Sequence, residues 1–97
     1  MTNLDNVRKA YESLYRKLKA KTVEAMDRAT LPVRVKEEIA EYISNLPHPR
    51  LASVWDIRDI CMTCVSGPLE HLYDLFGNDA RTILSEIQKQ KLTGNTS

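Results

Sequence analysis

The sequence predicts an all-α protein, and three observations support this prediction. Only three glycines and four prolines interrupt the 97 residues. No run alternates between apolar and polar side chains as a half-buried strand would, whereas apolar residues recur at spacings of three, four and seven, as on one face of a helix. The length and a hydrophobic content of 42% suit a single helical domain. We expect this domain over residues 1–92, followed by a disordered tail over 93–97.

The longest predicted helix runs from Leu4 to about Ala29, a stretch without proline or glycine, and Asn3 is its candidate N-cap. Its apolar residues form one narrow stripe, made of Leu4, Val7, Tyr11, Leu14, Leu18 and Ala25. A helix of this length extends about 40 Å. Because so narrow a stripe calls for a partner helix in so small a chain, we expect a homodimer.

Prolines delimit the next two helices. The second helix is expected to begin at Thr30-Leu31-Pro32, with Pro32 in its first turn. Pro47-His48-Pro49 should end or sharply bend it, because neither proline has a backbone N–H to donate. A third helix is expected from about Arg50 to Val65.

Glycines delimit the C-terminal part. Gly67-Pro68 predicts a turn, after which a short apolar helix should stop at Gly77. Asn78 or Asp79 is the candidate cap of a last helix, from Ala80 to about Leu92. The expected architecture is a long helical hairpin followed by short C-terminal helices.

Charge is distributed unevenly along the chain, although the net charge is only +1. Between Arg8 and Lys36 there are nine basic and three acidic residues, whereas Glu37 to Asp79 contains eight acidic and two basic residues. This separation indicates either a surface for an anionic partner or helices that are merely solvated on uneven faces.

Cys61 and Cys64 form the one motif of a metal or redox type. Two thiols three residues apart share a helical face and could bind a metal or form a redox pair. A structural zinc site needs four ligands, and only His48 and His71 remain as nitrogen donors. Both cysteines also fall on an apolar stripe, so we favour a packing role, without a cofactor or metal. Two cysteines are too few for a disulfide scaffold, and a reducing, cytoplasmic location fits best.

Catalytic patterns are sparse. No glycine-rich phosphate loop, nucleophile elbow or metalloprotease motif occurs. His71 lies beside Glu70, but a histidine on a short helix is usually a surface residue. We therefore expect a binding protein, neither an enzyme nor a membrane protein, without a small-molecule substrate.

The basic residues of the first helix border its apolar stripe on both sides. Arg8, Lys9, Arg16 and Lys19 fall within an arc of about 100° on one flank. Lys17, Lys21 and Arg28 gather on the other. A long, straight helix with basic edges matches the repeating phosphates of a nucleic-acid duplex. No short recognition helix for reading bases is evident, so recognition of shape and backbone is the expectation.

The order of several features resembles the small nodavirus suppressor of RNA silencing. Val23-Glu24-Ala25-Met26 near the end of the first helix is similar to a run in that family. As in that family, a loop ending in Pro32 follows, and Val35 and Lys36 open the second helix. Further along, Arg58 stands about ten residues before Gly67-Pro68, and an apolar helix ends at Gly77. Two departures are Pro47 and Pro49, where the family's second helix is unbroken, and Gly67, where the family has a lysine.

This resemblance implies an antiparallel homodimer that forms a four-helix bundle and binds double-stranded RNA irrespective of sequence. Such binding would shield the RNA from dicing and from small-RNA loading, with a host silencing protein as a further partner. Arg58 would be the central RNA contact, with Arg50 and Lys36 beside it. The basic stretch adds further candidate contacts, which are Arg34, Lys9, Arg16, Lys19 and Lys21.

Two other interpretations remain open. The chain could be a helical protein-interaction adaptor whose functional surface is the acidic half from Glu37 to Asp79. A small zinc- or redox-dependent regulator using Cys61 and Cys64 is the third.

Overall fold

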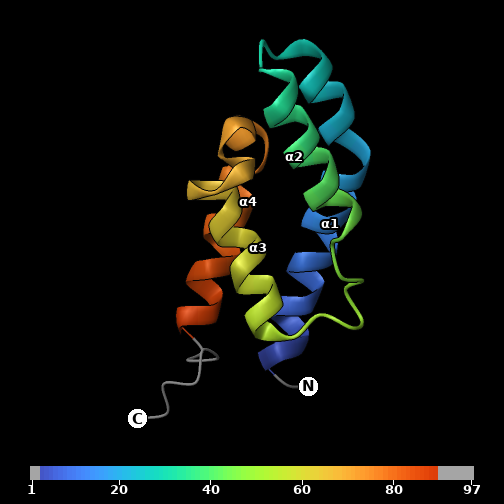
Figure 1. Cartoon of the computed structure of the whole chain (residues 1–97). Coiled ribbons are helices and arrows are strands. Elements are labelled where there is room, and N and C mark those ends of the chain that lie inside the picture. Colours follow the sequence, from blue (N-terminus) through green and yellow to red (C-terminus); the bar gives the residue numbers. More distant parts are fainter. Residues whose placement is uncertain (1–2, 90–97) are drawn as a thin grey trace.

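Helices account for most of the part that the structure describes, residues 3–89 of a computed structural model. The α-helices are α1 (Asn3–Arg28), α2 (Val33–Ser44), α3 (Val54–Ser66) and α4 (Tyr73–Lys89), with a short 3-10 helix η1 (Pro68–Leu72) before α4. These residues contain no strand, so the all-α prediction is confirmed. Successive α-helices run in opposite directions along a body 44 Å long (Figure 1).

The apolar stripe of α1 is covered by the chain's own helices. Val7, Tyr11, Leu14 and Leu18 are at most 1% exposed, and α1 packs against α2, α3 and α4. The predicted stripe is confirmed from Val7 to Leu18, whereas Ala25 is only half-buried and the side chain of Leu4 lies outside the described part. No second chain is needed to cover the confirmed part. The homodimer therefore stays a prediction that the resemblance alone supports.

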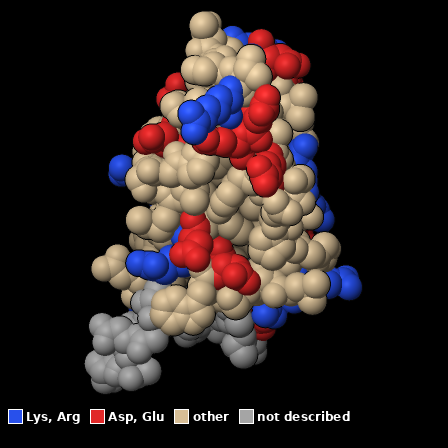
Figure 2. All heavy atoms as spheres, viewed as in Figure 1, with Lys and Arg blue, Asp and Glu red and all other residues tan. Residues whose placement is uncertain are grey.

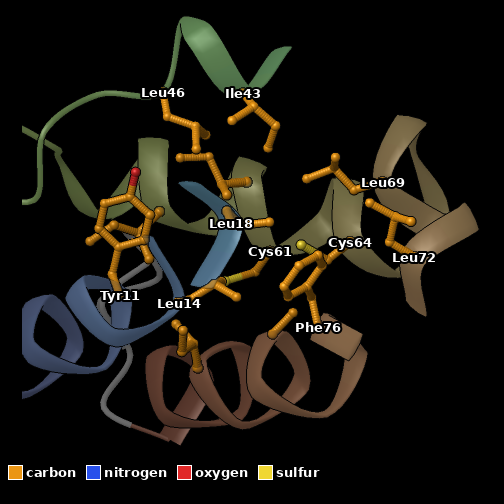
Figure 3. Close-up of a cluster of buried hydrophobic side chains, with 14 of the residues drawn as sticks. Tyr11, Leu14, Leu18, Ile43, Leu46, Cys61, Cys64, Leu69, Leu72 and Phe76 are labelled. Carbon is orange, nitrogen blue, oxygen red and sulfur yellow. The ribbon is translucent and has the colours of Figure 1, made fainter. Parts of the chain in front are cut away.

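One hydrophobic core joins all the helices. Figure 3 shows side chains from α1, α2, α3, η1 and α4 pointing toward one another, with Cys61 beside Leu14 and Cys64 beside Phe76. Both cysteines are fully buried, which confirms that they lie in the hydrophobic core. Burial of these apolar groups is the main source of stability in a chain this small.

The starts of α2 and α3 lie later than predicted. Pro32 is the N-cap of α2, so the helix begins at Val33. Helix α3 begins at Val54 and not near Arg50, because Ser53 and Asp56 form a capping box. The Asp56 backbone N–H donates to the Ser53 hydroxyl at 3.1 Å, and the Ser53 N–H donates to the Asp56 carboxylate at 3.0 Å. The chain from Asn45 to Ser53 forms the loop that we call the proline loop.

The predicted helix stop at Gly77 is wrong, because α4 continues through it. A Cβ at Gly77 would lie 2.3 Å from the Tyr73 ring, so this glycine is a packing position. Asn78 and Asp79 consequently lie within α4 and do not cap a helix at Ala80. With 17 residues, α4 is longer than α2, so the C-terminal helix is not short. The expected end near Leu92, the tail over 93–97 and the capping side chain of Asn3 lie outside the described part.

Candidate nucleic-acid interface

The proline loop is held against α1 by polar and aromatic contacts. The Tyr11 hydroxyl donates to the Pro47 carbonyl at 2.8 Å, and the Arg8 guanidinium donates through Nη2 to the Ala52 carbonyl at 3.4 Å. The His48 ring lies edge-on to the Tyr15 ring, with centroids 6.0 Å apart. These contacts fix a segment about 40 positions away in the sequence along one flank of α1.

Basic residues of the loop and of α1 meet at one hollow. A cavity of about 180 Å³ is lined by Arg8, Lys9, Glu12, Pro49 and Arg50. Pro49 is buried, whereas Lys9 and Arg50 are exposed. The structure therefore brings together Lys9 and Arg50, two of the predicted contacts.

The same flank of α1 continues with Arg16 and Lys19. Arg16 is exposed and pairs with Glu12 at 3.6 Å, and the Lys19 ammonium lies 5.5 Å from the centre of the Tyr15 ring. We call Lys9, Arg16, Lys19 and Arg50 the α1 face. In Figure 2 basic side chains (blue) follow the edge of the molecule along which α1 runs in Figure 1.

Three other predicted contacts lie elsewhere. Lys21 lines a hollow on the opposite flank of α1, together with Glu24, Arg28 and Leu75. Arg34 and Lys36 belong to the first turn of α2, where the exposed Arg34 side chain pairs with Glu38 at 3.8 Å. None of these three residues lines the hollow that Lys9 and Arg50 share.

Arg58 is exposed on α3 and separated from the proline loop by acidic residues. Asp56 and Asp59 line a hollow of about 170 Å³ together with Tyr42 and Pro47, on the side of α3 that meets the loop. Helical geometry places Arg58 about 100° around α3 from Asp59. Figure 2 shows acidic groups (red) over α2 and α3. Within one chain, Arg58 therefore lies outside the α1 face.

The thiols have the properties of core residues. Burial raises the pKa of Cys61 and of Cys64 to about 12, so neither thiol is an activated thiolate nucleophile at neutral pH. Within the described residues no group of three or more His, Cys, Asp or Glu side chains is placed to hold a metal ion. His71 lies exposed on η1.

Sequence reasoning missed the contribution of His48 and of the loop backbone to this interface. Pro47-His48-Pro49 was correctly predicted to end a helix, but nothing in the motif indicates that it packs on Tyr11 and Tyr15. Arg8 was placed on the correct flank of α1, yet only the structure shows it bound to the loop.

Comparison with known protein families, with curated proteins and with solved structures gives no match. No helix among the described residues is long and apolar enough to cross a membrane.

Proposed function

We propose that the protein binds the sugar–phosphate backbone of double-stranded RNA through the α1 face, irrespective of sequence. The observation that supports this proposal most strongly is the meeting of Arg8 and Lys9 with Arg50 at one hollow, from segments far apart in the sequence. Arg16 and Lys19 extend this positive charge along the same helix. Neutralising phosphates with such side chains is the main source of sequence-independent binding energy.

A duplex suits this surface for a geometric reason. Helix α1 is 26 residues long and therefore extends about 39 Å. The major groove of A-form RNA is too deep and narrow for side chains to read bases, so proteins contact its phosphates and 2′-hydroxyls. A long helix that presents cations along one edge can make such contacts without entering a groove.

The biological role follows from the resemblance to the nodavirus suppressor of RNA silencing. On this proposal the protein acts in the cytoplasm of a host cell and shields double-stranded RNA from dicing and from small-RNA loading. The resemblance also implies that the protein forms a homodimer and binds a host silencing protein as a second partner, and we include both in the proposal. Arg58, Arg34, Lys36 and Lys21 lie outside the α1 face, and this proposal assigns them no contact with the duplex.

A gel-shift comparison tests the class of ligand. Duplex RNA of about 20 base pairs should be shifted at lower protein concentration than single-stranded RNA of the same sequence. Two unrelated duplex sequences should bind equally, because the backbone is identical in both. Preference for one sequence, or for the single strand, would contradict the proposal.

Two matched arginine variants locate the binding face. Arg50→Gln should weaken duplex RNA binding about tenfold, whereas Arg58→Gln should have less than a threefold effect. The reverse result would place the binding face on α3, as the resemblance implies, and would overturn the α1 face. Both side chains are exposed, so neither change should disturb folding.

A protein-interaction module is the second candidate, and one observation favours it. Trp55 is 50% and Met62 39% exposed on α3, next to the acidic residues Asp56 and Asp59. Tryptophan and methionine are enriched at protein interfaces, so this face would suit a basic amphipathic helix. Trp55→Ala should abolish binding of such a partner, whereas RNA binding through the α1 face should persist.

A further inference from the structure

Three positively charged side chains, those of Arg8, Lys9 and Arg50, line one small hollow. The side chains of Arg8, Lys9 and Arg50 take part in none of the ion pairs Arg16–Glu12, Lys17–Asp79, Arg28–Glu24 and Arg34–Glu38. Glu12 also lines the hollow, but its carboxylate pairs with Arg16. Like charges that line one hollow repel one another, so a bound anion would stabilise the arrangement.

The Arg8 guanidinium is partly withdrawn from water and held in place. Its Nη2 donates to the Ala52 carbonyl at 3.4 Å, while its Nε is buried and has no hydrogen-bond partner. A charged group that has lost hydration gains more from a nearby anion than an exposed one does. Because Ala52 belongs to the proline loop, the same contact also fixes the segment that positions Arg50.

The loop backbone restricts where Arg50 can reach. The Arg50 N–H donates to the His48 Nδ1 at 3.1 Å, and the Leu51 and Ala52 N–H groups donate to the His48 carbonyl at 2.8 and 2.9 Å. Pro49 is buried beneath this turn. The Arg50 side chain therefore starts from an ordered backbone, which reduces the entropy lost when it closes on a ligand.

We propose that this hollow binds a single phosphate group of a phosphate ester, with Arg8 and Arg50 as guanidinium donors and Lys9 as a third cation. Guanidinium groups form paired hydrogen bonds with phosphate oxygens, and an ammonium adds a point charge. The inference rests on the proposed function and deepens it, because the bound group would be a phosphate of the RNA. That phosphate is either an internal phosphodiester or a terminal 5′-monophosphate.

Arginine side-chain NMR spectra provide a test that needs no RNA. The buried Nε–H of Arg8 should exchange slowly with water and give a resolved signal. Titration with inorganic phosphate should shift the Arg8 and Arg50 signals saturably and leave the Arg81 signal unchanged. Uniform shifts of all arginines would indicate screening by salt and would overturn the proposal.

Variants separate the hollow from the rest of the surface. Arg50→Gln should weaken phosphate binding by about tenfold, whereas Lys21→Gln, on the opposite flank of α1, should leave it unchanged. Circular dichroism confirms that each variant is folded. Equal binding by wild type and Arg50→Gln would remove the proposed site.

Duplex RNA distinguishes the two phosphate sources and the two possible failures. A duplex with 5′-phosphates should bind more tightly than one without them if the site takes a terminal phosphate, and equally if it takes an internal one. If inorganic phosphate binds at Arg8 and Arg50 but duplex RNA does not, the proposed function fails and the hollow stands. If duplex RNA binds equally to wild type and to Arg50→Gln, the hollow and the contribution of Arg50 to the α1 face are refuted, whereas RNA binding itself stands.

Discussion

Replacing Tyr11 by phenylalanine tests the link between the core and the candidate interface. The Tyr11 ring is fully buried, and its hydroxyl donates to the Pro47 carbonyl at 2.8 Å. Burial raises the pKa of this hydroxyl well above its ordinary value, so it stays a neutral donor. The change keeps the ring in the core but removes the hydrogen bond between α1 and the start of Pro47-His48-Pro49.

The expected loss of stability follows from that single hydrogen bond. A typical intramolecular hydrogen bond contributes about 1 kcal/mol net, and leaving the acceptor without a donor costs about 1–3 kcal/mol. For a domain of about 100 residues, 1 kcal/mol corresponds to a fall in Tm of about 4–8 °C. Thermal unfolding followed by circular dichroism at 222 nm measures this shift.

Tyr73→Phe is the matched control, because the Tyr73 ring packs on Gly77 and faces Arg81, away from the proline loop. Tyr11→Phe should also weaken duplex RNA binding about two- to fivefold, since a looser loop positions Arg50 less well. An unchanged Tm, or a loss no greater than that of Tyr73→Phe, would refute the reasoning that this hydrogen bond fixes the loop.

Three further predictions concern packing, pH dependence and assembly. Gly77→Ala should lower Tm, because its Cβ would approach the Tyr73 ring to 2.3 Å. Helix propensity alone predicts the opposite, a gain in stability of about 1 kcal/mol, so a higher Tm would contradict the packing of Gly77 on Tyr73. Between pH 9 and 12 the buried Cys61 and Cys64 thiols stay protonated, while those of the unfolded chain ionise. The free energy of unfolding, measured with urea, should therefore fall by about 1.4 kcal/mol per pH unit for each thiol. The variant with both cysteines replaced by alanine should lose this pH dependence. If its free energy of unfolding depends on pH as steeply as that of wild type, the thiols ionise in the folded protein. Light scattering should report twice the chain mass of 11.1 kDa if the resemblance holds, and a monomer would remove the bundle of two chains.

The sequence alone predicts the all-α fold class and the buried face of α1. Val7, Tyr11, Leu14 and Leu18 repeat at helical spacing, and such a stripe must be buried whatever covers it. What covers it could not be predicted, because helix periodicity does not distinguish the chain's own helices from those of a second copy.

Errors in the element boundaries have local physical causes. Gly77 was predicted to end a helix because glycine often does, but contact with Tyr73 explains its presence inside α4. The start of α3 could have been predicted correctly, because Ser53 and Asp56 have the spacing of a capping box. Local propensity was outweighed by tertiary packing in the first case and overlooked in the second.

The candidate interface was only half predictable. Helical spacing places Lys9, Arg16 and Lys19 on one flank of α1 from the sequence alone. The arrival of Arg50 beside Lys9 depends on hydrogen bonds between segments 36 to 44 residues apart, and no local pattern encodes them. The role of Arg58 as a central contact stays a prediction of the resemblance.

A salt series of duplex RNA binding by fluorescence anisotropy tests the central claim most directly. The logarithm of the binding constant should fall linearly with the logarithm of the salt concentration, by about 0.7–0.9 for each phosphate neutralised. For the double variant Lys9→Gln/Arg50→Gln, this slope should be smaller by roughly one to two, and binding should be at least tenfold weaker. The matched Lys21→Gln/Arg58→Gln variant should bind duplex RNA with the slope and affinity of wild type. Equal slopes for wild type and Lys9→Gln/Arg50→Gln, or no binding of duplex RNA at low salt, would contradict the assignment of the α1 face as an RNA-binding surface.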